Sequence, residues 1–277
     1  MKVKHYDGLG NTFCIVDYDE VQDLAFTQLA KQLCNGEQFA TDGLIIVKTN
    51  PLEMIFYNRD GSYSSMCGNG IRCFAKYVLD AGILAADIKT FTVITGAGSL
   101  LVEIVAADPF LCKINMGRPS FTPAAVKLAD QGPLNRQLEI QGQTVNTYSV
   151  LMGTVHTVVF VDNLECAKNH NLGEQIHKHP LFTEKTNVNF VKILANDKIA
   201  VRTFEKGVGF TKACGTGCCA SFVIAKKLGF LTAETVTVCL EAGNLTISAT
   251  GNCCESDIYM LGPARYNYGG EVTKALK

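Results

Sequence analysis

Two cysteines are the residues of this chain best suited to carry chemistry, because the same short motif surrounds both. Cys67 opens the motif CGNG and Cys214 opens the motif CGTG. An apolar stretch of helical period follows each motif, so we expect each thiol to lie at the start of a helix. There the first backbone N–H groups are unpaired and the helix dipole is positive, which favours a thiolate and a bound anion alike. One such thiol in each half of the chain predicts a two-thiol active site.

A pair of opposed thiols suits the inversion of a stereocentre. Removing a proton from one face of a carbon and returning one to the other face requires a base and an acid on opposite sides, and a thiolate and a thiol differ by one proton. Two helix N-termini converging on a carboxylate would stabilise the charge that develops when an amino acid loses its Cα proton. We therefore predict stereoinversion at the Cα of an amino acid, with no cofactor and no metal.

The two cysteine motifs belong to a longer internal repeat. Asp17 and Asp162 each close an apolar, strand-like run and lie 145 positions apart. Four more pairs follow in the same order at offsets of 145 or 147, namely Thr41–Val47 with Thr186–Val191, Asn58 with Glu205, Cys67 with Cys214, and Ala97–Leu100 with Ala242–Leu245. Landmarks that recur in one order at a nearly constant offset indicate duplicated domains.

Each half is predicted to be rich in strands around one main helix. We expect the main helices over Ile71–Leu79 and Cys218–Leu228, each ending close to a glycine that suits a left-handed cap. A second, more polar helix is expected over Leu24–Leu33 and over Gly173–His177. The stretch from Met116 to Val145 is richer in Pro, Gly and Gln and is predicted to be a connection.

Length and composition exclude several classes of protein. A chain of 277 residues is long for one core and favours two domains. The net charge of −1, with no basic stripe, argues against a protein that binds nucleic acid. The N-terminal segment lacks the apolar core of a signal peptide and no run is long enough to span a bilayer, so we expect a cytoplasmic protein without a membrane partner.

The twelve cysteines need an explanation of their own. A disulfide framework is disfavoured, since cytosolic thiols stay reduced and a chain of this size does not need one. A structural zinc site is disfavoured because no pair of CxxC motifs occurs. We expect two of the cysteines to be chemically active and the others to be small buried side chains.

Further segments make the chain resemble the diaminopimelate epimerase family, amino-acid racemases and epimerases that work without pyridoxal phosphate. The matching segments, in chain order, are GLGNTF at 8–13, TDG at 41–43, YNRDGSYSSMCGNGIRC at 57–73, GTVH at 153–156, TNVNFV at 186–191 and FEKGVGFTKACGTGCCAS at 204–221. The resemblance implies an α/β (α+β) fold of two similar domains, each a β-barrel-like sheet around a central helix, with the active site in the cleft between them. It places the first domain at 1–115 plus 263–277 and the second at 116–262.

The resemblance also implies roles for individual residues. Cys67 and Cys214 match the two catalytic acid/base thiols. The positions that match substrate-binding residues are Gly68, Asn69, Gly215 and Thr216 in the cradle for the α-carboxylate, His156 and Glu205 near the thiols and the α-amino group, Asn11, Asn58 and Asn187 along the site, and Lys206 toward the distal end of the substrate.

Two positions depart from the family pattern at that distal end. Thr154 stands where the family usually has an asparagine, and Lys206 stands where it usually has an arginine. Arginine binds a carboxylate through two parallel hydrogen bonds, which lysine cannot reproduce. We therefore place a substrate such as histidine first, as in the histidine racemases that resemble this family, and diaminopimelate second.

Three other classes of protein remain as alternatives. A phenazine-biosynthesis-type isomerase resembles this duplicated fold but uses a single acid/base residue, whereas two cysteines are present here. A thiol redox protein usually keeps its cysteines close together, as in CxxC, while Cys67 and Cys214 lie 147 positions apart. A catalytically inactive ligand-binding module would tolerate loss of either thiol. The expected partner is a small amino-acid substrate, and the sequence leaves a homodimer open.

Overall fold

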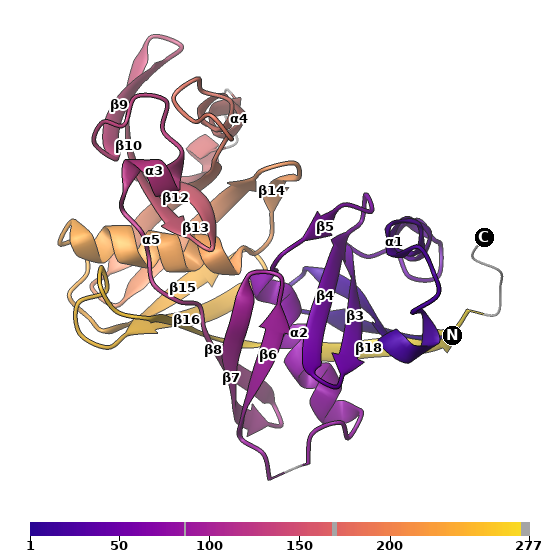
Figure 1. Ribbon diagram of the computed structural model, residues 1–277. Helices are drawn as coiled ribbons and strands as arrows, with labels where there is room; N and C mark the ends of the chain where they lie inside the picture. The colour runs from indigo at the N-terminus through magenta and orange to yellow at the C-terminus, as the bar shows by residue number, and fades with distance from the viewer. Residues whose placement is uncertain (86, 168–170, 273–277) are drawn as a thin grey trace. The chain divides into compact units, whose positions relative to one another are not determined.

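The chain divides into two compact units in a computed structural model that describes residues 1–85, 87–167 and 171–272 (Figure 1). The first unit comprises Met1–Ile114 and Leu261–Lys277, and the second comprises Asn115–Met260. The last five residues of the predicted first domain, 273–277, lie outside the described residues. The second unit ends, and the chain returns to the first unit, within strand β17 (Ile258–Pro263).

The first unit is a mixed sheet wrapped around one helix. Its strands are β1 (Lys2–Asp7), β2 (Thr12–Asp17), β3 (Gly43–Thr49), β4 (Leu52–Asn58), β5 (Tyr63–Ser64), β6 (Thr90–Thr95), β7 (Gly98–Ala107), β8 (Phe110–Asn115) and β18 (Arg265–Glu271). Its helices are the short η1 (Tyr18–Glu20), α1 (Phe26–Asn35) and α2 (Gly68–Asp80). The pairing runs β18–β1–β2–β3–β4–β6–β7–β8 with β5 added to β4, and only the β2–β3 and β4–β6 pairs are parallel.

The second unit repeats this arrangement. Its strands are β9 (Asn135–Ile140), β10 (Gln143–Met152), β11 (Thr154–Phe160), β12 (Asn187–Ala195), β13 (Lys198–Glu205), β14 (Gly209–Thr211), β15 (Thr235–Leu240) and β16 (Gly243–Ala249). Its helices are α3 (Pro123–Val126), the short η2 (Leu164–Ala167), α4 (Leu172–His177) and α5 (Gly215–Lys227). The pairing runs β9–β10–β11–β12–β13–β15–β16 with β14 added to β13, and the parallel pairs are β11–β12 and β13–β15. The shared strand order confirms the predicted duplication and α+β class.

Each unit is built in layers around its central helix. Helix α2 contacts β1, β2, β3, β4 and β18, and helix α5 contacts β10, β11, β12, β13 and β16 (Figure 1). Both helices are buried nearly all round, which is the pattern of an interior helix. The second helices α1 and α4 pack on the outer faces of β2–β3 and β11–β12. Strands buried on both faces are continuously apolar, as in Leu44–Val47.

The central helices confirm the predicted positions but begin three residues earlier. Helix α2 begins at Gly68 and α5 at Gly215, so the cysteines themselves are the N-caps. Both helices end in a Schellman motif, in which Gly82 and Gly229 have positive φ values of 66° and 78°. The whole CGxG motif is therefore part of the helix start, and the thiols occupy the predicted place.

The predicted connection from Met116 to Val145 was partly wrong. Residues Asn135–Ile140 form β9, which pairs with β10 in an antiparallel hairpin. Gln141 and Gly142 make the two-residue turn, with φ values of 52° and 75° that match a type I′ turn. The many polar residues here are the exposed alternate positions of an outer strand. Among the described residues, no helix is long and apolar enough to cross a membrane.

Candidate active site

Cys214 lies at the N-cap of α5, in contact with the first turn of the helix. Its backbone is extended, with φ −133° and ψ 108°, which turns the side chain toward the helix start. The sulfur lies 3.5 Å from the Thr216 hydroxyl oxygen and beside Gly217, where a Cβ atom would stand 3.2 Å from it. The backbone N–H groups of Gly215 and Thr216 have no acceptor among the described residues. They form the kind of cradle that binds a carboxylate.

Gly217 has no room for a side chain. A Cβ atom there would lie 2.4 Å from Oδ1 of Asn189, 3.0 Å from Oγ1 of Thr203 and 3.2 Å from Sγ of Cys214. An amide oxygen from β12, a hydroxyl oxygen from β13 and the sulfur of the N-cap thus all pack against this glycine. The second glycine of the motif is required by this close approach as well as by the helix start.

Glu205 is the titratable group that contacts Cys214. It ends β13, is half-buried, and accepts a hydrogen bond from the Thr211 hydroxyl on β14. Burial raises the pKa of Glu205, while its interactions with Thr211 and Cys214 act in the opposite direction. Burial also raises the pKa of Cys214 well above its usual range, and the charge of Glu205 raises it further. The thiol is therefore held protonated, with an acceptor for its proton beside it.

His156 is fully buried on β11 and is neutral. Burial lowers its pKa to about 3. Its Nδ1 lies 3.1 Å from Nδ2 of Asn189, and its Nε2 lies 3.1 Å from the hydroxyl oxygen of Thr154. Gly153, with a positive φ of 70°, brings this end of β11 close to α5, since a Cβ there would lie 3.3 Å from Cγ2 of Thr216.

Both polar atoms of the Asn187 amide are hydrogen-bonded within the protein. Its Nδ2 donates to the hydroxyl oxygen of Thr154 at 3.0 Å and to the carbonyl of Val155 at 3.1 Å. Its Oδ1 accepts from the backbone N–H of Lys206 at 2.8 Å. Asn187 therefore ties together the two positions that depart from the family pattern, and its geometry is that of a positioning residue. The ammonium of Lys206 is exposed and has no ion pair among the described residues.

Cys67 occupies the equivalent place in the first unit. It is the N-cap of α2, with φ −138° and ψ 114°, and its sulfur accepts a hydrogen bond from the backbone N–H of Gly70 at 3.4 Å. A Cβ atom on Gly70 would lie 3.2–3.4 Å from Cβ and Sγ of Cys67 and from Cδ1 of Ile45. Both cysteines are thus N-caps with nearly the same backbone conformation, but the sulfur of Cys67 accepts a hydrogen bond from the helix start whereas that of Cys214 does not. Cys67 is half-buried, and Cys214 is buried.

A buried arginine supports the first turn of α2. Arg72 has no exposed surface and donates to the carbonyls of Pro263, Gly68 and Gly8 at 3.0, 3.1 and 3.0 Å. Its Nη1 also donates to Oδ1 of Asn69 at 3.1 Å. The guanidinium thus joins the helix start to the 8–11 loop and to β17, and it fixes the side chain of Asn69. Asn69 and Gly68 both lie in the predicted carboxylate cradle.

The two remaining predicted residues, Asn11 and Asn58, also belong to the first unit. Asn11 follows the loop residue Gly8 that Arg72 holds, and its Oδ1 is buried with no hydrogen-bond partner in the part of the chain that the structure describes. A substrate N–H group would satisfy this atom. Asn58 ends β4, where Nδ2 donates to the hydroxyl of Ser62 at 3.0 Å. It lies opposite Gly43 at the same end of the strands as Thr12 and Asp42.

The sequence did not single out three residues that the structure places at these sites. Asn189 and Thr203 lie directly opposite each other on β12 and β13, next to the start of α5, and Arg72 lies under the start of α2. Asn189 lies two positions after Asn187 on the same strand, and this spacing, which puts both side chains on one face of a strand, was the signal that could have found it. An arginine within an apolar helix was the corresponding signal in the first unit.

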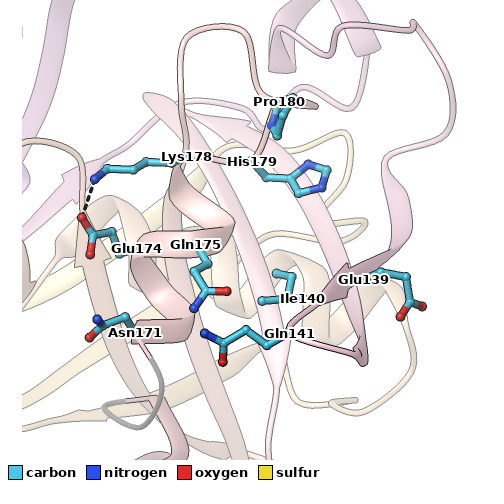
Figure 2. A pocket seen from close by; sticks show the side chains of 9 residues that line it. All are labelled: Glu139, Ile140, Gln141, Asn171, Glu174, Gln175, Lys178, His179 and Pro180. Atoms are coloured by element: carbon cyan, nitrogen blue, oxygen red, sulfur yellow. Dashed lines mark hydrogen bonds and ion pairs between the residues drawn. The ribbon is translucent and has the colours of Figure 1, made fainter.

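A surface pocket of about 430 Å³ lies elsewhere in the second unit. Its lining residues are Glu139, Ile140, Gln141, Asn171, Glu174, Gln175, Lys178, His179 and Pro180. Figure 2 shows these side chains between the turn that joins β9 to β10 and helix α4, with Glu174 and Lys178 paired one helical turn apart. None of the predicted site residues lines this pocket, and an exposed pair of this kind stabilises a helix only slightly.

Comparison with known proteins identifies the family. A family model described as diaminopimelate epimerase matches residues 3–122 and 148–267, one segment for each half of the repeat. A diaminopimelate epimerase of Alkaliphilus metalliredigens is 38% identical over 272 residues, covering 96% of this chain and 95% of that protein. The chain belongs to the diaminopimelate epimerase family. A second relative of that name, from Halothermothrix orenii, is 39% identical over 277 residues and covers 96% of this chain and 95% of its own length. Membership in this family makes the protein an isomerase of the epimerase type.

Solved structures share the duplicated fold of this family at low sequence identity. A phenazine biosynthesis protein of the PhzF family from Bacillus anthracis has a TM-score of 0.74 at 17% identity, covering 99% of both chains. A probable proline racemase from Agrobacterium radiobacter K84 has a TM-score of 0.71 at 15% identity, covering 100% of this chain and 93% of its own. At these identities the likeness concerns the fold alone.

Proposed function

We propose that this protein inverts the configuration at Cα of a free amino acid, with Cys67 and Cys214 as the base and the acid. The observation that carries the proposal is the arrangement repeated in the two units. In each, a cysteine is the N-cap of a buried central helix, and its sulfur lies beside the second glycine of the motif. Family membership supports the reaction class, and the retention of both thiols supports two-base chemistry.

The proton transfers balance between the two sulfurs. A thiolate removes the Cα proton and becomes a thiol, while the other thiol gives its proton to the opposite face of the same carbon and becomes a thiolate. Cys214 begins as the thiol, because burial and the charge of Glu205 raise its pKa. Cys67 then begins as the base, and the roles exchange in the reverse reaction. The Glu205 carboxylate, whose charge acts on the Cys214 thiol, would orient its S–H bond.

The carboxylate of the substrate takes up the charge that develops at Cα. The backbone N–H groups of Gly215 and Thr216 have no acceptor among the described residues and lie at the positive end of α5. Preorganised donors of this kind stabilise a developing anion without reorganisation during the reaction. The buried Oδ1 of Asn11 would accept from the α-ammonium group. All of these steps use groups of the protein, with no cofactor or metal.

For the substrate, we propose diaminopimelate. Relatives named diaminopimelate epimerase that are 35–39% identical over nearly the whole chain favour it over histidine, which the sequence placed first. The exposed ammonium of Lys206, which has no ion pair within the described residues, supports it as well, since a lysine binds a second carboxylate as a point charge.

Histidine is the second candidate, and the substitutions at Thr154 and Lys206 favour it. The chain lacks the planar fork of arginine and the asparagine amide that its family usually has at these positions. A site with fewer donors for a distal carboxylate discriminates less against substrates that lack one.

Two experiments test the proposal. In deuterated water the wild type should incorporate solvent deuterium at Cα of the inverted product, and Cys67→Ala and Cys214→Ala should each abolish inversion. Cys73→Ala, which removes a buried cysteine of α2 outside the motif, is the matched control and should retain activity. Full activity in either active-site variant would refute the two-base mechanism. In a panel of L-amino acids, turnover of histidine without turnover of L,L-diaminopimelate would refute the proposed substrate.

A further inference from the structure

A chain of hydrogen bonds leads from β13 to Thr154, the exposed first residue of β11. Thr203 lies 2.9 Å from Oδ1 of Asn189, Nδ2 of Asn189 lies 3.1 Å from Nδ1 of His156, and Nε2 of His156 lies 3.1 Å from Oγ1 of Thr154. The first three residues are buried, and Thr154 is exposed. Because every interior link needs one donor and one acceptor, the direction of the first bond fixes the direction of all the others.

Two directions are available to this chain, and they leave Thr154 in opposite states. If Asn189 turns Nδ2 toward His156, then Nδ1 is an acceptor, the imidazole proton is on Nε2, and Nε2 donates to Thr154. If the amide is reversed, the proton is on Nδ1 and the Thr154 hydroxyl donates to Nε2. Only the first arrangement leaves the hydroxyl proton of Thr154 available for another group.

The surroundings of Asn189 select the first arrangement. Thr203 is 2% exposed, and its only acceptor among the described residues is the side chain of Asn189. In the reversed arrangement its hydroxyl proton would be buried without a partner, which is costly. The same atom of Asn189 also lies within 2.4 Å of the place where a Cβ of Gly217 would stand, so it faces the Cα–H of that glycine. An oxygen is favourable there and an NH₂ group is not.

The hydroxyl oxygen of Thr154 then accepts two hydrogen bonds. One comes from Nε2 of His156 at 3.1 Å, and the other comes from Nδ2 of Asn187 at 3.0 Å. A hydroxyl oxygen has two lone pairs, so both are used and the group can only donate. No acceptor for that proton lies within hydrogen-bond distance among the described residues.

We propose that Thr203, Asn189 and His156 form a relay that fixes the Nε2–H tautomer of His156 and makes the Thr154 hydroxyl an obligate hydrogen-bond donor. These three are positioning residues, and Thr154 is the specificity-determining residue that they set. The part concerning specificity rests on the proposed function. The Asn187 side chain also accepts from the backbone N–H of Lys206, and Thr154 together with the exposed ammonium of Lys206 recognises a hydrogen-bond acceptor on the substrate. A distal carboxylate meets both donors.

The tautomer is measured directly by two-dimensional NMR of the imidazole nitrogens in ¹⁵N-labelled protein at neutral pH, with His156 assigned from the spectrum of His156→Asn. The wild type should show Nε2 protonated and Nδ1 bare. In Asn189→Asp the carboxylate has no N–H to donate, so Nδ1 should carry a proton. Thr203→Val should mix the two tautomers. Thr157→Val is the matched control, since it removes a buried hydroxyl of β11 that bonds Ser149 and Thr186 instead, and it should leave the spectrum of His156 unchanged.

Steady-state kinetics then tests the specificity. Thr154→Val should raise KM about tenfold for a substrate with a distal carboxylate, while Thr154→Ser, which keeps the donor, should stay within about twofold. For an amino acid whose side chain has no hydrogen-bond acceptor, the KM values of Thr154→Val and Thr154→Ser should not differ from each other. Nδ1–H in the wild type, or the wild-type tautomer in both relay variants, would overturn the relay even if the enzyme is active. Equal KM values for Thr154→Val and Thr154→Ser would overturn the role of Thr154, while failure of the Cys67 and Cys214 tests would overturn only the proposed function.

Discussion

Adding one methyl group at the second glycine of each motif should have different effects in the two copies of the repeat. In Gly217→Ala the new Cβ would stand 2.4 Å from Oδ1 of Asn189 and 3.0 Å from Oγ1 of Thr203, both buried and hydrogen-bonded to each other. In Gly70→Ala the nearest atoms lie at 3.2–3.4 Å and belong to Cys67 and Ile45. The same substitution is therefore a severe clash in one unit and a tight fit in the other.

The expected effects follow from opposing contributions. Alanine in place of glycine favours a helix by about 1 kcal/mol. Overpacking a buried site costs roughly 1–3 kcal/mol, and losing the Thr203–Asn189 hydrogen bond adds about 1 kcal/mol. Gly217→Ala should therefore lower the free energy of unfolding by about 2 kcal/mol. For Gly70→Ala a few tenths of an ångström of adjustment nearly cancels the helix gain, and the net change should be about zero.

Differential scanning calorimetry measures this difference, and the activity of each variant measures its effect on the thiols. A loss of about 2 kcal/mol corresponds to a fall in Tm of roughly 4–8 °C for a protein of this size. Gly217→Ala should also lose most of its activity, since the new Cβ would lie 3.2 Å from Sγ of Cys214. Equal Tm values for the two alanine variants, or a Gly217→Ala protein as stable as the wild type, would refute the close packing of the amide, hydroxyl and thiol around Gly217.

Three further predictions concern single buried groups. Arg72→Met leaves four acceptors without their donor. Urea titration should therefore show a free energy of unfolding lower by about 3 kcal/mol or more, and Arg72→Lys should recover part of this loss. Because burial lowers the pKa of His156 to about 3, its contribution to stability is complete above about pH 6.5 and is lost as the pH falls toward 3. When the pH falls from 6.5 to 5, the free energy of unfolding of the wild type should decrease by about 2 kcal/mol more than that of His156→Asn. Glu205→Gln removes a charge that raises the pKa of Cys214, so the pH midpoint for alkylation of Cys214, followed by peptide mass spectrometry, should fall.

Each of these predictions has a clear contrary result. Arg72→Met with wild-type stability would show that the buried guanidinium makes no net contribution. Parallel pH–stability curves for the wild type and His156→Asn would show that the imidazole titrates normally in the folded protein. An unchanged or higher alkylation midpoint in Glu205→Gln would show that the carboxylate does not face the sulfur.

Local patterns in the sequence predicted the elements that carry the two thiols. The CGxG motif ahead of an apolar helical stretch placed Cys67 and Cys214 at helix starts, and the constant offsets between landmarks predicted two units of one topology. These predictions succeeded because helix initiation and strand alternation depend on residues that are close in the sequence. The segment Asn135–Ile140 was missed because an exposed outer strand has too few apolar positions to show the alternation clearly.

The sequence by itself determined that this protein is a duplicated epimerase fold with one thiol at the start of each central helix. The tertiary structure decided which buried side chains contact those helix starts and hydrogen-bond to one another there. Asn189 is hydrogen-bonded to Thr203, 14 positions away in the sequence, and to His156, 33 positions away. Arg72 is hydrogen-bonded to Pro263, 191 positions away. No local pattern encodes which buried donor finds which acceptor, because that choice depends on strands being paired in register. The register placed Asn187 between Thr154 and Lys206 and occupied its amide, so the polar groups left open to a substrate could be identified only after folding.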